Sequence, residues 1–346
     1  MIRSEIMTYK SAFLGCGGRA RGHAHAYQYV KNGKMVAICD LDEERLNAFG
    51  NDFGIEKRYT DIHEMLDKER PDLLHIVTPP TLRVGLMTIA AEHEVPVAIV
   101  EKPIAIQGED WRQIRELRKT SKTKFVVNTQ LHFHARNLEL KRDVAEGRIG
   151  EIRFIDISAR STILDQGVHV LELCHSYNGG VAPTSVFGNV SGTKTIPTRQ
   201  PSPDVAEAAI TFENGVRAQM LNGLEVAPKV IDNDSPYAHK RISVYGAHGF
   251  VQWTMHGWER STPEGGYESG SHNYGEEDVL GQARLTDAAF DWVKDENNLH
   301  PTRLELSLVQ FNIILGIYVS ALNNVPVSLP FEPPDGLLDA LKSRLE

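Results

Sequence analysis

The chain has 346 residues, of which 41% are hydrophobic and 24% are charged, and its formal net charge is −9. This length is enough for two domains with substantial cores, and the composition is typical of a globular protein. The negative charge argues against a nucleic-acid groove or an anionic membrane surface as a partner.

Cysteine usage and hydropathy point to a cellular compartment. Cys16, Cys39 and Cys174 form no C-x-x-C pair and are odd in number, which predicts a reducing compartment. The first residues contain neither a signal-type apolar core nor twin arginines, and no apolar run approaches the roughly 18 residues of a membrane span. We therefore expect a cytoplasmic protein without a membrane partner.

The first third of the chain alternates short apolar runs with stretches of helical period. Strands are predicted in SAFLG, MVAICD, LLHIVTPP, VPVAIVEKP and KFVVNTQ, because each run is short and rich in β-branched residues. Helices are predicted at 43–53, 62–70, 82–94 and 110–122. This alternation predicts a doubly wound α/β sheet, a Rossmann dinucleotide-binding domain over residues 1–128.

The pattern changes at residue 151, where strands follow one another with little helix between them. They are predicted at 151–159, 185–193, 206–215, 216–223, 241–249 and 250–255, with glycine turns in ENG and GAHG. A long loop is predicted at 257–279 and a helix at 304–322. Residues 129–346 are thus expected to form an α/β substrate-binding and oligomerisation domain with a large, mostly antiparallel open sheet. The Pro-rich C-terminal tail could pack back on the first domain.

A G-x-G-x-x-A pattern follows the first predicted strand directly, in LGCGGRARGHAHAY. Gly15 fits the tight turn, Gly17 lets the backbone approach a pyrophosphate, and the small Ala20 lets the helix pack on the strand. Gly18 and Arg19 lie in the same turn. The anion would meet free N–H groups at a helix N-terminus. A plain glycine-rich turn is the alternative if the pattern stands alone.

Asp40 ends the second predicted strand, twenty residues after Ala20. A carboxylate there can bind the ribose hydroxyls of NAD, and it would repel the 2′-phosphate of NADP by ~1–4 kcal/mol. A cap or turn role for Asp40 is the alternative. Arg19 and Arg21 are the opposing signal, because either could neutralise an extra phosphate.

Lys102 follows the fourth long strand in AIVEKPIA, at the carboxyl end of a sheet strand where ligands bind in open α/β folds. An ammonium group there could stabilise a developing alkoxide. The alternative is an exposed loop lysine paired with a carboxylate.

The segment ILDQGVHVLELCH, residues 163–175, carries a possible acid/base pair. If 165–177 is helical, Asp165, His169 and Glu172 lie on one stripe. His169 has a suitable intrinsic pKa for a general base, and Asp165 could orient its ring. His175 lies well round the helix, which weakens a metal site. A polar helix face and a zinc site based on the His132-x-His134 pair are the less favoured alternatives.

Together these motifs resemble the Gfo/Idh/MocA family of glucose-fructose oxidoreductase and inositol dehydrogenase-like enzymes. The segments GCGGRARGHAHAY, VAICDLDEER, VTPP, EKPIA, GRIGEIRFI and FENGVRAQ follow the family's order, as does the D-x-x-x-H of LDQGVHVLE. The resemblance implies a Rossmann domain, a second domain with an open sheet, and homodimers or homotetramers built on that sheet. It also implies roles for three sets of residues: catalysis by Lys102, Asp165 and His169; cofactor binding by Thr78, Pro79, Glu101 and Lys102; and substrate binding by Lys102, Gln130, His132, Asp165 and His169.

The sequence thus predicts an NAD-dependent dehydrogenase that oxidises a secondary hydroxyl of a sugar, sugar derivative or cyclitol, without a metal. A redox-neutral, NAD-dependent glycoside hydrolase is an alternative, as is a non-catalytic NAD- and sugar-sensing regulator. The family pattern is interrupted at Arg160–Ile163, at Arg83 and in QLHFHAR, all near the expected substrate pocket. The substrate is therefore less defined than the cofactor.

Overall fold

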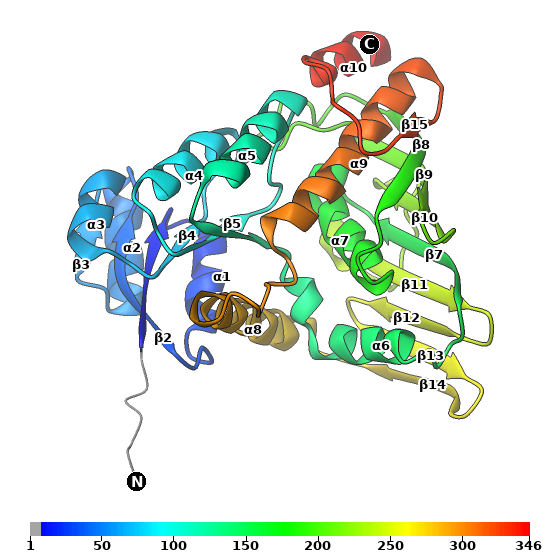
Figure 1. The fold of residues 1–346 in the computed structure, drawn as a ribbon, viewed down its shortest axis with the longest axis horizontal. Coiled ribbons are helices and arrows are strands. Elements are labelled where there is room, and N and C mark those ends of the chain that lie inside the picture. The colour runs from blue at the N-terminus through cyan, green and yellow to red at the C-terminus, as the bar shows by residue number, and fades with distance from the viewer. Residues whose placement is uncertain (1–7) are drawn as a thin grey trace. The chain divides into compact units, whose positions relative to one another are not determined.

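The computed structural model describes residues 8–346, which form two compact units (Figure 1). Unit 1 contains the chain up to Glu101, together with Ile114–Phe133 and Asp278–Leu304. Unit 2 contains Lys102–Gln113, His134–Glu277 and Glu305–Glu346. The units are interleaved in sequence, whereas the predicted domains 1–128 and 129–346 are consecutive. That division stays a prediction.

Unit 1 is built on a parallel sheet, which among the described residues has six strands in the order β3-β2-β1-β4-β5-β6. The strands are β1 (Tyr9–Leu14), β2 (Gly33–Cys39), β3 (Lys57–Tyr59), β4 (Leu73–Ile76), β5 (Val97–Glu101) and β6 (Lys124–Asn128). The five predicted strands are present. The strand β3 is not predicted from the sequence, because its three residues, KRY, carry no apolar run.

The helices that follow these strands are α1 (Gly18–Ala26), α2 (Glu43–Phe53), α3 (Ile62–Glu69), α4 (Arg83–Glu92) and α5 (Gly108–Thr120), with 3₁₀ turns η1 (Pro80–Leu82) and η2 (Gln130–Phe133). Two of these helices, α2 and α3, begin directly after an aspartate that caps them. Asp42 accepts a hydrogen bond from the Arg45 backbone N–H and Asp61 accepts one from Glu64, which satisfies first-turn donors of α2 and α3. The strand–helix alternation confirms the predicted doubly wound fold.

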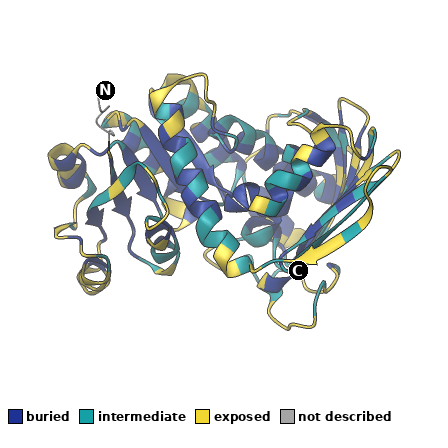
Figure 2. Cartoon of the chain, turned by 90° about the horizontal axis from the view of Figure 1, so that it is seen from below, coloured by how far each residue is buried: buried dark blue, intermediate teal, exposed yellow. Residues whose placement is uncertain are grey.

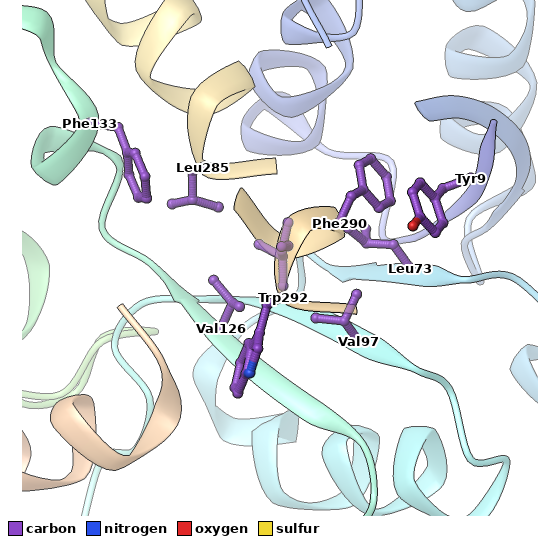
Figure 3. Packing of buried hydrophobic residues seen from close by; sticks show 10 residues of the cluster. Tyr9, Leu73, Val97, Val126, Phe133, Leu285, Phe290 and Trp292 are labelled. Carbon is purple, nitrogen blue, oxygen red and sulfur yellow. The ribbon is translucent and has the colours of Figure 1, made fainter. Parts of the chain in front are cut away.

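A buried cluster joins the parallel sheet to the helix α8 (Tyr274–Lys294), whose residues from Asp278 on belong to unit 1 (Figure 3). Tyr9 of β1 stacks on Phe290 of α8 with ring centroids 4.6 Å apart. Val97 and Val126, from β5 and β6, lie in the same cluster. A segment late in the sequence therefore completes the core of the first unit.

Unit 2 is built on a sheet that, within the described chain, has nine strands in the order β14-β13-β12-β11-β7-β10-β9-β8-β15. The strands are β7 (Ile152–Ala159), β8 (Pro183–Ser191), β9 (Val205–Phe212), β10 (Arg217–Asn222), β11 (Lys240–Gly246), β12 (Phe250–Thr254), β13 (Gly257–Thr262), β14 (Gly266–Ser271) and β15 (Val327–Ser328). β7 and β10 pair in parallel and the other neighbours are antiparallel. The predicted mostly antiparallel sheet is confirmed.

One face of this sheet is buried and the other is partly exposed. Ile155 and Ile157 of β7 are fully buried, whereas Phe154, which precedes Ile155 and points to the other face, is 39% exposed. Figure 2 shows many half-buried and exposed positions along these strands. The remaining helical elements of unit 2 are α6 (Ala135–Ala145), the π-turn η3 (Ile163–Gly167), α7 (Val168–Tyr177), the 3₁₀ turn η4 (Pro236–Ala238), α9 (Leu304–Asn323) and α10 (Leu337–Leu345).

Helix α9 is apolar enough to span a membrane by composition, the one such helix in the described part of the chain, with a mean hydropathy of 1.5. In the same 18-residue window, however, 78% of the residues are buried inside the protein. This burial is typical of a core helix.

The long loop predicted at 257–279 is wrong. The segment forms the hairpin β13–β14 and the first turn of α8. Arg260 bridges the hairpin by binding Glu268, and it also binds Asp143 on α6 at 2.8 Å. Trp258 packs under the guanidinium of Arg136 with 4.0 Å to the ring centroid. Asp143 and Arg136 lie more than a hundred residues away in sequence. An interpretation that weighs only the local glycine content therefore could not reveal the strands.

Candidate active site

The glycine-rich turn after β1 forms a cradle at the N-terminus of α1. Gly15 has φ +91°, and a Cβ there would lie 2.3 Å from the carbonyl oxygen of Val77. Only glycine fits this turn. A Cβ on Gly17 or Gly18 would project into open space, and Ala20 is fully buried against the sheet. The turn therefore offers an anion close access to helix N–H groups, as the pyrophosphate of NAD requires.

Asp40 lies directly after β2 and faces this cradle. Its Oδ2 accepts a hydrogen bond from the Cys16 backbone N–H at 2.8 Å, and its Oδ1 accepts one from Asp42 at 2.9 Å. Asp40 thus does serve the turn, as the alternative interpretation expected. The Arg45 guanidinium also lies 3.7 Å from Oδ2. A carboxylate has about four acceptor sites, so these contacts leave acceptor capacity for ribose hydroxyls.

Arg19 and Arg21, the two arginines that could favour NADP, both have carboxylate partners in unit 1. Arg19 Nε donates to Glu101 Oε1 at 3.0 Å, and its Nη1 lies 3.5 Å from Asp278. Arg21 Nη1 donates to Asp52 at 2.5 Å. These contacts weaken the case for a bound 2′-phosphate.

The segment after β4 is held by a fully buried arginine. Arg83 donates to the carbonyl oxygens of Ile76 and Thr78, both at 3.3 Å. Burial lowers the pKa of Arg83 to about 10. Thr78 and Pro79, which are predicted to bind the cofactor, lie on this fixed segment. The segment runs next to the Gly15 turn, because Gly15 packs on the Val77 carbonyl oxygen.

Glu101 is the end of a buried hydrogen-bonded chain. His23 Nε2 lies 2.8 Å from Glu101 Oε1, His23 Nδ1 lies 3.1 Å from His75 Nδ1, and His75 Nε2 lies 2.8 Å from the Tyr27 hydroxyl. Burial lowers the pKa of both histidines, so each carries one ring proton. Since a carboxylate only accepts, the protons must all point toward Glu101. Asn128 also donates to Glu101 at 2.7 Å.

Gln130 and His132, predicted to bind substrate, are buried in the 3₁₀ turn η2 of unit 1. Gln130 Nε2 donates to Asp278 Oδ1 at 2.8 Å, and His132 packs on the Phe133 ring. The zinc interpretation assumed a strand here. His134 is instead the N-cap of α6, and no cluster of three metal-binding side chains occurs among the residues that the structure describes.

Lys102 and Asp165, 63 residues apart in sequence, form an ion pair in unit 2. Lys102 Nζ donates to Asp165 Oδ1 at 3.0 Å and to the Asp165 backbone oxygen at 2.6 Å. The Lys102 and Asp165 side chains are 13% and 20% exposed. Burial opposes ionisation of Asp165, but the Lys102 charge and hydrogen bonds from Ser161, Lys102 and Gln166 outweigh it and lower the pKa of the carboxyl group.

The helix that the stripe argument assumed over 165–177 is α-helical only from Val168 on. Residues Ile163–Gly167 form a π-turn in which the Thr162 carbonyl accepts from the N–H groups of Asp165, Gln166 and Gly167. The single stripe predicted for Asp165, His169 and Glu172 assumed 3.6 residues per turn and does not extend through this wider turn. His169 and Glu172 share α7 and are both buried.

The structure adds four residues around Asp165 that the sequence analysis missed. Ser161 Oγ donates to Asp165 Oδ2 at 2.8 Å and Gln166 Nε2 donates to Asp165 Oδ1 at 3.0 Å. Lys240 Nζ donates to Gln166 Oε1 at 2.9 Å. Asn222 packs so closely on Gly167 that a Cβ there would lie 2.7 Å from the Asn222 amide nitrogen. From the sequence alone, only Ser161 and Gln166 could have been suspected of binding Asp165, because they lie close to it in the chain.

Comparison with known proteins agrees with these features. Residues 9–129 match the family model described as "Oxidoreductase family, NAD-binding Rossmann fold". The D-apiose dehydrogenase of Paraburkholderia graminis is 28% identical over 62% of this chain and 60% of its own length. The D-apiose dehydrogenase of Rhizobium rhizogenes is 27% identical over 70% of this chain and 72% of its own length.

The fold is also shared with solved structures. An oxidoreductase from Agrobacterium radiobacter in complex with NAD⁺, L-tartaric acid and magnesium superposes with a TM-score of 0.80 at 22% identity, over 93% of this chain and 98% of that protein. The described cradle, its helix N-terminus and Asp40 fit the NAD that the family model implies. Residues 9–129 thus match the NAD-binding Rossmann domain of the Gfo/Idh/MocA oxidoreductase family, and the chain shares its overall fold with solved oxidoreductases.

Proposed function

We propose that this protein oxidises a secondary hydroxyl of a sugar, sugar derivative or cyclitol to a ketone, with hydride transfer to NAD. The observation that carries the proposal is the partly buried Lys102–Asp165 ion pair in a chain with an NAD-binding Rossmann fold. The ion pair fixes the Lys102 ammonium group where only 13% of the side chain is exposed, so its remaining N–H can stabilise an alkoxide. A binding protein without turnover has no need of such a group.

Three side chains would share the chemistry. We assign His169 as the base that takes the hydroxyl proton, Lys102 as the donor to the same oxygen, and Asp165 as the anion that orients them. As the proton leaves, the C–H bond breaks and the C=O bond forms. NAD supplies the acceptor for the hydride when it is bound. The ionised state of Asp165 follows from its lowered pKa.

The substrate class is supported by the named relatives. Besides the two D-apiose dehydrogenases, the myo-inositol 2-dehydrogenase of Thermotoga maritima is 24% identical over 69% of this chain. The substrates named for these relatives, D-apiose and myo-inositol, are polyhydroxylated and uncharged. We therefore place a polyol ring or chain at the Lys102–Asp165 pair.

A substrate panel tests this proposal. Purified protein with NAD is mixed with D-apiose, myo-inositol, scyllo-inositol and common hexoses, and NADH formation is followed by absorbance. Formation of NADH with at least one polyol, and its loss in Lys102→Met, is the expected result. Cleavage of a nitrophenyl glycoside without net NADH would instead identify the redox-neutral hydrolase. NAD binding without either reaction would identify a sensor.

We also propose that the protein is a homodimer or homotetramer built on the partly exposed face of the nine-stranded sheet. Phe154, Phe187, Tyr245 and Tyr267 are between 39% and 62% exposed on strands of this sheet. Such aromatic surface is unusual on a face that remains in water. A second copy would cover it.

A further inference from the structure

We propose that Lys240 is a positioning residue of the Lys102–Asp165 site and that it acts on Asp165 through the side chain of Gln166. The catalytic meaning of this inference rests on the proposed function. Its geometry does not, because every contact lies within unit 2 and can be tested without turnover.

The four side chains form one continuous chain of contacts. Lys240 Nζ donates to Gln166 Oε1 at 2.9 Å. Gln166 Nε2 donates to Asp165 Oδ1 at 3.0 Å, and the same Oδ1 accepts from Lys102 Nζ at 3.0 Å. A cation therefore lies at each end, with the carboxylate and one amide between them.

The Gln166 amide is fixed in one orientation by this arrangement. An ammonium group only donates and a carboxylate only accepts, so Gln166 must turn its oxygen to Lys240 and its NH₂ group to Asp165. Both contacts are charge-assisted, which makes them stronger than bonds between neutral groups. The amide thus transmits the charge of Lys240 to the carboxylate.

Lys240 is placed for this role by the alternation of β11. Lys240, Ile242 and Val244 share the buried face of the sheet, and Lys240 is only 3% exposed. Its ammonium group also donates to the Tyr237 carbonyl at 3.0 Å and lies 5.6 Å from the centroid of the Tyr274 ring. A lysine buried to this degree is costly unless its charge is engaged. These contacts engage it and point the group toward Gln166.

The contacts on Asp165 show what the arrangement achieves. Oδ1 is held by Lys102 and Gln166 and Oδ2 by Ser161, so the carboxylate plane cannot rotate freely. The backbone cannot yield either, because Gly167 packs directly on Asn222. Without Lys240 the Gln166 amide could turn over and present its oxygen to Asp165. The carboxylate would then lose a donor, and Lys102 would lose its fixed partner.

The direct test is the ionisation of Asp165 in protein labelled with ¹³C-aspartate, with the signal assigned by Asp165→Asn. Lys240→Met and Gln166→Leu should each raise the pKa of Asp165 by about 0.5–1 unit, since each removes a donor or its orientation. The double variant should give no more than the larger single effect. Lys240→Arg should restore the wild-type value. Lys141→Met is the matched control, because Lys141 is a lysine of α6 whose pKa burial lowers to about 8, and it should leave Asp165 unchanged.

An activity measurement separates this inference from the proposed function. With the polyol that the panel identifies, Lys240→Met should lower kcat by about 10- to 100-fold and leave the affinity for NAD unchanged. If no polyol reacts, the proposed function fails while the carboxyl titration still decides the role of Lys240. An unchanged pKa of Asp165 in Gln166→Leu, a variant of a half-buried residue, would overturn the inference even if Lys240→Met does not fold.

Discussion

At the scale of single residues, the Lys102–Asp165 pair sets the charge state in which the site works. Asp165 has a pKa below its ordinary value, so it stays ionised at neutral pH and keeps Lys102 bound as an ammonium group. Asp165 is then a weak base near neutrality, and Lys102 is its partner in the ion pair. This leaves His169, the buried histidine of the first turn of α7, as the group that we assign as base.

The first prediction concerns His169. His169→Ala should lower kcat by about 10²–10⁴-fold with almost unchanged NAD affinity, because only proton transfer is lost. With wild-type protein, kcat/KM should rise with pH as the base loses its proton, and this rise should be absent from the pH profile of His169→Ala. Glu172→Gln and His175→Ala are the controls on the same helix, and each should cost much less. Loss of turnover in His175→Ala but not in His169→Ala would show that the assignment is wrong.

The second prediction concerns the choice of cofactor. The protein should prefer NAD, and Asp40→Ser should narrow the ratio of kcat/KM for NAD over NADP by about tenfold, because the carboxylate no longer repels the 2′-phosphate. Asp42→Ser removes the neighbouring carboxylate, whose N-cap role a serine hydroxyl can take over, and should leave this ratio unchanged. A wild-type preference for NADP would contradict the role of Asp40.

From the sequence, the residues of the candidate site can be predicted, but most of the contacts among them cannot. Lys102, Asp165 and the glycine turn stand out because each belongs to a short motif with a chemical reason for its spacing. Lys240 is the first residue of the strand KRISVYG. Nothing in the neighbouring sequence distinguishes it from an exposed lysine. Its burial follows from the pairing of β11 with β7, which is a long-range property. The same holds for His75, an atypical polar residue in a buried strand.

At the scale of elements, the π-turn before α7 is the feature that departs most from local expectation. Helical period alone favours one α-helix from 165 to 177. The structure places a wider turn at Ile163–Gly167, packed against Asn222 at the end of β10. The tight contact at Gly167 belongs to tertiary packing, so the sequence could suggest a close approach there but not the partner.

The third prediction tests this contact through stability. Gly→Ala in an unhindered helix stabilises a protein, but Gly167→Ala should destabilise unit 2 by about 1–3 kcal/mol, because the new Cβ collides with the Asn222 amide. Asn222→Ala in the same chain should recover part of the loss. Gly85→Ala on α4 meets no atom within 4 Å and serves as the control that should not destabilise. Denaturant unfolding measures all three, and a Gly167→Ala variant as stable as wild type would refute the contact.

The fourth prediction uses a buried histidine in the segment after α8. His300 Nε2 donates to the Leu285 carbonyl at 3.0 Å and its Nδ1 accepts from Thr302 at 3.1 Å, and burial lowers its pKa to about 3. The unfolded chain takes up the proton below about pH 6.5, before the folded one does. The free energy of unfolding should therefore fall by about 1.4 kcal/mol per pH unit on acidification from pH 6 toward 4.

The matched variant for this slope is His300→Gln, which keeps a donor and cannot titrate. Its free energy of unfolding should be lower at pH 7 but should depend less steeply on pH in the same range. Equal slopes in the two proteins would show that His300 is protonated in the folded state.

At the scale of the whole molecule, the two units differ in how far the sequence predicts them. The Rossmann-type sheet follows from short, consecutive strand–helix repeats and was anticipated almost strand by strand. The nine-stranded sheet draws its edge hairpin, β13–β14, from a glycine-rich segment and its last strand, β15, from near the C-terminus. The strand β15 pairs with β8, which is distant in sequence, whereas the hairpin pairs neighbouring strands that carry no apolar run and are held to α6 through Arg260 and Asp143.

The fifth prediction is the assembly state. Light scattering at micromolar concentration should give two or four times the chain mass of 38.6 kDa. Tyr245→Glu with Phe154→Glu, two neighbouring rings on the partly exposed sheet face, should shift the protein toward the monomer. A wild-type protein that is monomeric under these conditions would contradict the proposed interface.

The central claim, hydride transfer from a secondary alcohol to NAD, is tested most directly with isotope. The polyol that the panel identifies is prepared with deuterium on its carbinol carbon and incubated with the protein and NAD, and both products are analysed by mass spectrometry. One deuterium should appear in the reduced nicotinamide for each molecule of ketone formed. Ketone without deuterium in the cofactor, or an altered sugar with no net reduced cofactor, would contradict the proposed reaction.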